Sequence, residues 1–269
     1  MSTLGVLRGL ALACHPLPTV AVTLLALLLA VGSAGPREVI VVVAAVLSGQ
    51  LVIGWHNDLL DASRDRASGR TDKPIARGDV SSRTVRLALL CALVLTVLLS
   101  LCSSGWLGVV LHVGFVVGSG MAYNAGLKAT LWSWVPYAVA FGTLPAFVWI
   151  SVGRGAAPWW AVAVGALLGV GAHLLNVLPD LEEDRRAGIR GFPHRIGARA
   201  SRVLAPVLLL TGTVLLAVAP EGAPPVWGWL AVGAAAVLAV PAVVARGKVP
   251  FRAAIGIALI NVIALALSG

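Results

Sequence analysis

Charged residues are scarce in this chain, and their scarcity excludes most soluble folds. Only 12% of the 269 residues are Asp, Glu, Lys or Arg, whereas 59% are hydrophobic. The mean hydropathy is +0.95. A soluble domain of this length could not bury so much apolar surface. The sequence therefore predicts a protein whose solvent is the lipid bilayer.

Cysteines and acidic residues are also few. Cys14, Cys91 and Cys102 stand at no metal-ligand spacing, which argues against a zinc site or a disulfide framework. Eleven acids face 20 Lys and Arg, which gives a net charge of +9. The basic residues nevertheless alternate with acids in a few short loops, and no nucleic-acid-binding motif accompanies them. We therefore expect no nucleic-acid partner.

Long apolar runs occupy the rest of the chain. A membrane-spanning helix needs about 20 apolar residues. Lipid offers no partner to the backbone, so every run is expected to be helical, which makes the fold an all-α multi-pass membrane protein. The nine expected spans cover residues 16–34, 38–60, 84–103, 105–123, 131–150, 157–178, 203–219, 226–245 and 251–268.

The basic residues divide unequally between the two sides of such a bundle. With nine spans, 18 of the 20 Lys and Arg fall on the side of the N-terminus, and only Arg37 and Arg154 fall on the other. The positive-inside rule then places the N-terminus in the cytoplasm. The preference for Arg over Lys, with abundant Ala, Val, Gly and Leu, is typical of a GC-rich bacterial genome. The expected location is therefore the bacterial inner membrane.

Two stretches of the chain, 57–83 and 176–202, match each other without a gap at an offset of 119 residues. Ten of the 27 positions are identical. The identities include Asn57/Asn176, Asp61/Asp180, Asp65/Asp184, Gly69/Gly188, Pro74/Pro193 and Gly78/Gly197. We therefore expect a single membrane domain over 1–269 that arose by internal duplication and carries one acidic motif loop per copy.

Nine of the eleven acids lie in these two loops or in the helix ends that lead into them. Asp58, Asp61 and Asp65 share one side of a helix if the second span continues beyond the membrane. A stripe of carboxylates on one helix requires a cation, and carboxylate and amide oxygens suit Mg²⁺, which also bridges phosphate oxygens. The second stripe consists of Asn176, Asp180 and Asp184.

Other side chains near the motifs complete the expected site. Lys128 lies in a short cytoplasmic connection, and Asn124 shares its helical face, so both are candidates to bind a diphosphate. Pro179 is expected to kink the sixth span beside the second stripe. Three further residues are candidates to line a cavity, where aromatic faces could stabilise a carbocation. They are Tyr137, Phe141 and His173.

The segments just described resemble the motifs of a known family. Asn57-Asp58-x-x-Asp61-x-x-x-Asp65 and Asp180-x-x-x-Asp184 resemble the two aspartate-rich motifs of the UbiA superfamily of intramembrane prenyltransferases. The segment from Asp72 to Gly78 resembles its basic-Pro-Ile stretch. The chain departs from the family pattern at Asn176, where an aspartate is common. It also has Asn124 at the position of a tyrosine, with Tyr123 one residue away.

The resemblance implies nine helices in a ring around a central cavity, with two Mg²⁺ ions and an isoprenyl diphosphate held between the motifs on the cytoplasmic side. The implied metal ligands are Asn57, Asp58, Asp61, Asp65, Asp180 and Asp184, with Asn176 as a weaker one. Asp58, Asp61, Asp180 and Asp184 are the implied catalytic carboxylates. The implied diphosphate contacts are Arg70, Lys73 and Lys128, to which we add Asn124.

The expected reaction is Mg²⁺-dependent transfer of a prenyl group from its diphosphate to an aromatic or other lipophilic acceptor. Electrostatic stabilisation of the leaving diphosphate would drive it. Two alternatives stay open. Some members resembling this family cyclise their own prenyl cation without an acceptor, as terpene cyclases. A cation-coupled transporter would instead need carboxylates near the middle of the bilayer.

Overall fold

The computed structural model describes residues 3–267 except 68, 70–72, 187 and 246–248. Every regular element in this described part is a helix, as the sequence predicts. The chain folds into two compact units. The first comprises Met1–Ala125 and Ser151–Gly153, and the second comprises Gly126–Ile150 and Arg154–Gly269. Each unit contains one of the two acidic motifs.

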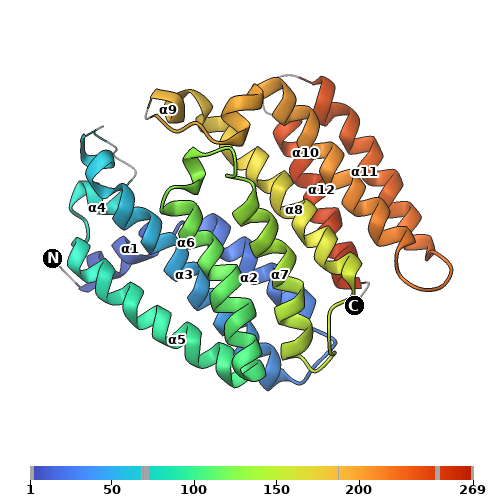
Figure 1. The fold of residues 1–269 in the computed structure, drawn as a ribbon, viewed down its shortest axis with the longest axis horizontal. Helices are drawn as coiled ribbons and strands as arrows, with labels where there is room; N and C mark the ends of the chain where they lie inside the picture. Colours follow the sequence, from blue (N-terminus) through green and yellow to red (C-terminus); the bar gives the residue numbers. More distant parts are fainter. Residues whose placement is uncertain (1–2, 68, 70–72, 187, 246–248, 268–269) are drawn as a thin grey trace. The chain divides into compact units, whose positions relative to one another are not determined.

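The first unit is organised around one long helix, α3, and its core consists of side chains from α1, α3, α4 and α5. Trp55 and Val52 of α3 pack there with Ile75 of α4 and Leu89 of α5. The helices of this unit are α1 (Thr3–Ala13), α2 (Pro16–Ala30), α3 (Pro36–Ala67), α4 (Pro74–Arg77), α5 (Ser82–Gly108), the π-helix η1 (Val109–Val117) and α6 (Gly118–Asn124) (Figure 1).

The second unit packs α10 against α8, α11 and α12 (Figure 1). Asn261 of α12 is buried and donates hydrogen bonds to the carbonyl oxygens of Leu209 (2.9 Å) and Ile257 (3.0 Å), which ties α12 to α10. The elements are η2 (Leu127–Ala129), α7 (Val135–Ser151), α8 (Trp159–Val177), η3 (Leu178–Asp180), α9 (Leu181–Arg186), α10 (Phe192–Val218), α11 (Val226–Val244) and α12 (Val249–Leu267).

Six helices in the described chain are long and apolar enough to cross a membrane, and the bent pair α1–α2 is a seventh candidate. One of the six, Ser82–Asn124, is 43 residues long, yet its backbone leaves helical geometry at Ser104 (φ −151°, ψ 30°) and Gly105 (φ 64°, ψ −153°). The chain turns back there, so η1 packs against α5 (Figure 1). The apolar helix α7 has 17 residues.

Helix α3 continues well beyond its apolar run, as predicted for the second span. It extends for 32 residues to Ala67, because nothing in its last three turns breaks the helix. Asn57, Asp61 and Asp65 therefore stand four residues apart on one continuous helix and share a face. The first acidic stripe is confirmed as a feature of a single helix.

The repeat found in the sequence is also present in the backbone. Gly69 and its counterpart Gly188 adopt positive φ angles of 68° and 80°, and Gly78 and Gly197 adopt 82° and 81°. Pro74 and Pro193 each occupy the first turn of a helix. Each motif is thus followed by glycines with positive φ at matching positions, a conformation that glycine adopts without strain. The match is limited to φ, because ψ is 12° at Gly78 and 166° at Gly197.

Helix α3 contacts the break between α1 and α2 without any intervening side chain. A Cβ placed on Gly54 would overlap the backbone of Cys14, including its carbonyl oxygen. One residue further on, the indole Nε1 of Trp55 donates to the carbonyl oxygen of Leu10 at 2.9 Å. His15, at the break itself, is the one non-glycine residue in the described chain with positive φ (56°). Close packing against Gly54 therefore fixes where the chain bends.

We expect Gly54→Ala to destabilise the protein by about 1–3 kcal/mol, because the added methyl group has no space beside Cys14. The melting temperature in detergent, followed by tryptophan fluorescence, should fall by several degrees. Gly114→Ala is the matched control, because a Cβ there meets no atom within 4 Å. Equal melting temperatures for the two variants would contradict the close packing at Gly54.

Candidate metal and diphosphate site

The first motif presents an asparagine whose orientation is fixed by its neighbours. The side-chain amide Nδ2 of Asn124 donates to the carbonyl oxygen of Ile53 at 3.0 Å, so its Oδ1 is left to accept. It accepts from Nδ2 of Asn57 at 3.2 Å. Asn57 is thereby oriented with its own oxygen turned away from Asn124, which suits a metal ligand. Asn124 was expected to contact a diphosphate. The structure shows that it also contacts Asn57.

The two aspartates that follow Asn57 on the same face of α3 differ in exposure. Asp61 is partly exposed. Its Oδ2 is ion-paired to Nη2 of Arg64, one turn later on the same helix, at 2.9 Å. Asp65 is buried. With Asn57 they place three oxygen donors at the end of an apolar helix, whereas the stripe expected from the sequence had Asp58 in the place of Asn57.

Asp58 points to a different neighbourhood from Asn57, Asp61 and Asp65. Its Oδ1 accepts a hydrogen bond of 3.0 Å from Nζ of Lys73, and Nε2 of His15 lies 3.8 Å from the same oxygen. The Lys73 ammonium also lies 3.1 Å from Nε2 of His15. Asp58 is only 1% exposed. The expected metal ligand Asp58 and the expected diphosphate contact Lys73 are therefore ion-paired to each other.

The second motif lies at the end of α8, in the second unit. The α-helix gives way to the 3-10 turn η3 at Leu178–Asp180, which contains Pro179, so the expected distortion of the sixth span is present. Asn176 and Asp180 are exposed. Asp184, on α9, accepts from Nε2 of His194 at 3.2 Å, and the His194 side chain is 3% exposed.

A hydroxyl group connects three segments beside this motif. Oγ of Ser133 accepts from the backbone N–H of Phe192 at 2.8 Å and hydrogen-bonds Nε2 of His173 at 3.0 Å. A Cβ on Gly191 would lie 2.5 Å from the carbonyl oxygen of Lys128. The Lys128 segment therefore packs against the start of α10. His173 is buried in this contact.

Three arginines and a histidine line a pocket of ≈ 400 Å³ in the second unit: Arg185, Arg190, Arg195 and His194. Two of the arginines are held by backbone oxygens. Arg195 donates from Nε to the carbonyl oxygen of Arg190 (3.0 Å), and Arg185 donates from Nη2 to that of His194 (3.1 Å). The acid paired with Arg185 is Glu182, whose side chain is 79% exposed. The pocket is therefore lined by guanidinium groups and by the imidazole that contacts Asp184.

The structure brings together the three residues that were expected to line a cavity. The rings of Tyr137 and Phe141 are stacked with centroids 6.3 Å apart, and the Tyr137 ring lies 4.8 Å from that of His173. Tyr137 and Phe141 are half-buried. They form an aromatic surface on α7, and its Tyr137 ring lies beside the imidazole of His173.

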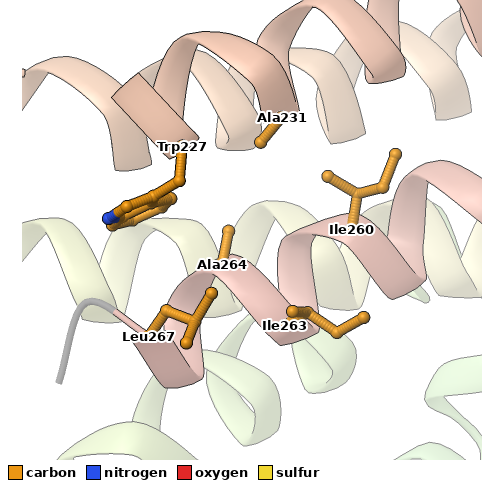
Figure 2. A pocket seen from close by; sticks show the side chains of 6 residues that line it. All are labelled: Trp227, Ala231, Ile260, Ile263, Ala264 and Leu267. Atoms are coloured by element: carbon orange, nitrogen blue, oxygen red, sulfur yellow. The ribbon is translucent and has the colours of Figure 1, made fainter. Parts of the chain in front are cut away.

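Another pocket of the second unit lacks reactive groups. The pocket has a volume of ≈ 180 Å³ and lies between α11 and α12. In Figure 2, Trp227 and Ala231 lie on one side of it, and Ile260, Ile263, Ala264 and Leu267 lie on the other. None of these six side chains can ionise.

Of the residues expected at the site, Arg70 lies outside the described residues. Among the described residues, no three His, Cys, Asp or Glu side chains gather closely enough to hold a metal ion by themselves. The sequence reasoning did not identify His15, Ser133 or His194 as neighbours of the site. Only His15 carried a signal, because the proline that follows it favours a helix break.

The fold and these motifs define a class: a multi-pass helical membrane protein with a repeated Asn/Asp motif at the ends of apolar helices. The model of the UbiA prenyltransferase family matches residues 17–254. The chain belongs to the UbiA prenyltransferase family.

Known relatives agree with this assignment. The 33 kDa chain of bacteriochlorophyll synthase from Cereibacter sphaeroides is 32% identical over 197 residues, which is 68% of this chain and 63% of the relative's length. The apo structure of a UbiA homologue from Aeropyrum pernix K1 matches with a TM-score of 0.72 and 19% identity, covering 89% of this chain and 94% of that one. A UbiA homologue from Archaeoglobus fulgidus bound to DMAPP and Mg²⁺ matches with a TM-score of 0.71 and 17% identity, covering 98% of each chain.

We expect Asn124→Ala to raise the Mg²⁺ concentration for half-maximal prenyl transfer by about 10-fold, because outer-shell partners orient ligands such as Asn57. Titration of activity with Mg²⁺ measures this shift. Asn261→Ala, which also removes a buried asparagine bonded to backbone oxygens, is the control and should lower stability without moving the Mg²⁺ midpoint. An unchanged midpoint in Asn124→Ala would refute the orienting role.

Proposed function

We propose that the protein is an intramembrane prenyltransferase that uses Mg²⁺ to bind and ionise an isoprenyl diphosphate. One observation supports this most directly. Two matched oxygen stripes, Asn57/Asp61/Asp65 and Asn176/Asp180/Asp184, stand at the ends of apolar helices. The family contains a homologue whose solved structure holds DMAPP and Mg²⁺.

The residues present fit a hard divalent cation. Asn57 has its amide oxygen available because Asn124 engages its Nδ2, and the remaining donors are carboxylates. Each stripe alone offers few donors, which suits Mg²⁺, an ion that retains waters and takes substrate oxygens as ligands. We propose two ions, with Asn57, Asp61 and Asp65 as ligands in one copy and Asn176, Asp180 and Asp184 in the other. When bound, the metal neutralises charge on the leaving diphosphate.

The basic groups of the chain complete the proposed diphosphate site. Lys128 is held near the start of α10 by the packing of its carbonyl against Gly191. The arginine-lined pocket beside Asp184 supplies further N–H donors, and guanidinium groups bind phosphate oxygens in pairs. Arg70 is proposed as an additional contact. These groups bind the diphosphate and stabilise the charge that develops as the C–O bond breaks.

The cation and the acceptor require an apolar, water-poor environment. Tyr137 and Phe141 present stacked aromatic rings on α7, and their π faces can stabilise an allylic cation. Attack by an aromatic or lipophilic acceptor would then form the new bond to the prenyl group. The exclusion of water by the surrounding apolar helices protects the cation from hydrolysis.

We also propose nine spans and a cytoplasmic site. A continuous span of 43 residues would be about 65 Å long, roughly twice the hydrocarbon thickness, whereas the two halves on either side of Ser104 and Gly105 each match one crossing. Dividing this helix in two raises the six candidate spans to seven. The bent pair α1–α2 and the short helix α7 then bring the number to the nine expected from the sequence. The positive-inside rule then places both motifs and the N-terminus at the cytoplasmic face, in a ring around a central cavity. A bacterial inner membrane remains the proposed location.

We expect Asp61→Ala and Asp180→Ala each to lower turnover by about 100-fold or more, because each removes charge that stabilises the transition state. Chelation with EDTA should abolish activity and excess Mg²⁺ should restore it. Asp79→Asn is the control, because Asp79 pairs with Arg77 on the surface at 3.2 Å. Prenyl transfer from a radiolabelled diphosphate gives the rates. Full activity in EDTA would refute the metal-dependent reaction.

Cyclisation without an acceptor is the second candidate, because no arginine of the described chain lies in the middle of an apolar span, where it could anchor an acceptor carboxylate. Purified protein with Mg²⁺ and geranyl, farnesyl or geranylgeranyl diphosphate distinguishes the two. We expect the diphosphate to persist until a phenolic or other lipophilic acceptor is added, and then to be consumed. Cyclic hydrocarbon formed without acceptor would establish the cyclase instead.

A further inference from the structure

Asp58 does not belong to the part of the motif that is repeated. The motif positions that are identical in both copies are 57, 61 and 65, which recur as 176, 180 and 184. The counterpart of Asp58 is Val177. Lys73 likewise has an apolar counterpart, Phe192. Asp58 and Lys73, which are ion-paired to each other in the first copy, both have apolar counterparts in the second, as do the paired Arg77 and Asp79.

The contacts of Asp58 are made with the α1–α2 break and with the residue that precedes α4. Asp58 lies one turn after Gly54 and shares its face of α3, so it points toward the α1–α2 break that packs on Gly54. Lys73 reaches it from the residue that precedes α4, and His15 reaches both from the break. An ammonium group only donates, so the 3.1 Å contact is a hydrogen bond in which Lys73 is the donor and Nε2 of His15 the acceptor.

The geometry disfavours a metal ion on Asp58. A Mg²⁺ bound to Oδ1 would stand within a few ångströms of the Lys73 ammonium, which already lies 3.0 Å from that oxygen. Two cations so close in a buried setting repel strongly. Asp58 is also 1% exposed and the Lys73 side chain is 15% exposed, so neither presents itself to a ligand in this structure. The backbone strain at His15, with φ 56°, indicates that the contact is tightly determined.

We propose that Asp58, Lys73 and His15 form a positioning cluster that fastens α3 to α4 and to the α1–α2 break, so that Asn57 and Asp61 are held in register for the metal. The positioning role depends on the proposed function only in the experiments that measure activity. Asp58 is then not a metal ligand, and Lys73 is not a diphosphate contact. The counterpart positions in the second copy hold the apolar residues Val177 and Phe192.

The test transplants the second copy's residues into the first. The variants are Asp58→Val, Lys73→Phe and the double variant, compared in prenyl transfer and in Mg²⁺ titration. Each single change leaves one buried charge without its partner, whereas the double change removes both. We expect each single variant to lose activity by about 10-fold or more, and the double variant to recover to within about 3-fold of wild type, with an unchanged Mg²⁺ midpoint.

A double variant as inactive as Asp58→Val, or one whose Mg²⁺ midpoint rises as it does for Asp61→Ala, overturns the proposal and makes Asp58 a ligand. If Val and Phe do not pack and the double variant fails to fold, Asp58→Asn with Lys73→Gln tests the same coupling with a neutral hydrogen-bonded pair. The same cycle measured by thermal unfolding needs no activity. Additive losses of melting temperature in both cycles would also refute the pair, whatever reaction the protein catalyses.

Discussion

Lipid cannot hydrogen-bond a peptide group or solvate a charge, and this constraint determines where the protein can place its chemistry. Every long apolar run must be helical, and ionisable groups must gather where the helices end. Asp61 at the end of α3 and Asp180 in η3 after α8 follow this rule. The acids collect in two loops because the spans exclude them. A cation-coupled transporter would instead place such acids near mid-span.

The duplication explains why two such loops exist, and the divergence of the copies explains their different roles. The shared elements are the oxygen stripe, the left-handed glycines and the helix-starting prolines, which together form a backbone frame for ligands. The copies differ in how that frame is fastened. The first uses the buried Asp58–Lys73 pair, and the second uses Ser133 to join His173 to the backbone of Phe192. The matched motif residues are thus supported by different surroundings in the two copies.

The sequence predicted what depends on periodicity and composition. The apolar runs gave the helices, the spacing of Asp61 and Asp65 gave a face of α3, and the gap-free repeat gave the matching positions of the positive-φ glycines. It could not predict contacts that depend on tertiary packing. The pairing of Asp58 with Lys73 spans 15 residues and a turn, and Asn57 meets Asn124 from 67 residues away. The spacing of Asp58 predicted a place on the same helix side as Asp61 and Asp65, but it could not predict that Lys73 and His15 contact its carboxylate.

The central claim is that the matched stripes bind metal and prenyl diphosphate together. Geranyl S-thiolodiphosphate, which resists ionisation, permits binding to be measured without turnover, with Mn²⁺ in place of Mg²⁺ as a paramagnetic probe. The account predicts that the analogue binds only with metal, that it immobilises Mn²⁺ in the electron paramagnetic resonance spectrum, and that changing either Asp61 or Asp180 to Ala abolishes both effects. Tight binding of the analogue in the presence of chelator, unaffected by either substitution, would contradict it.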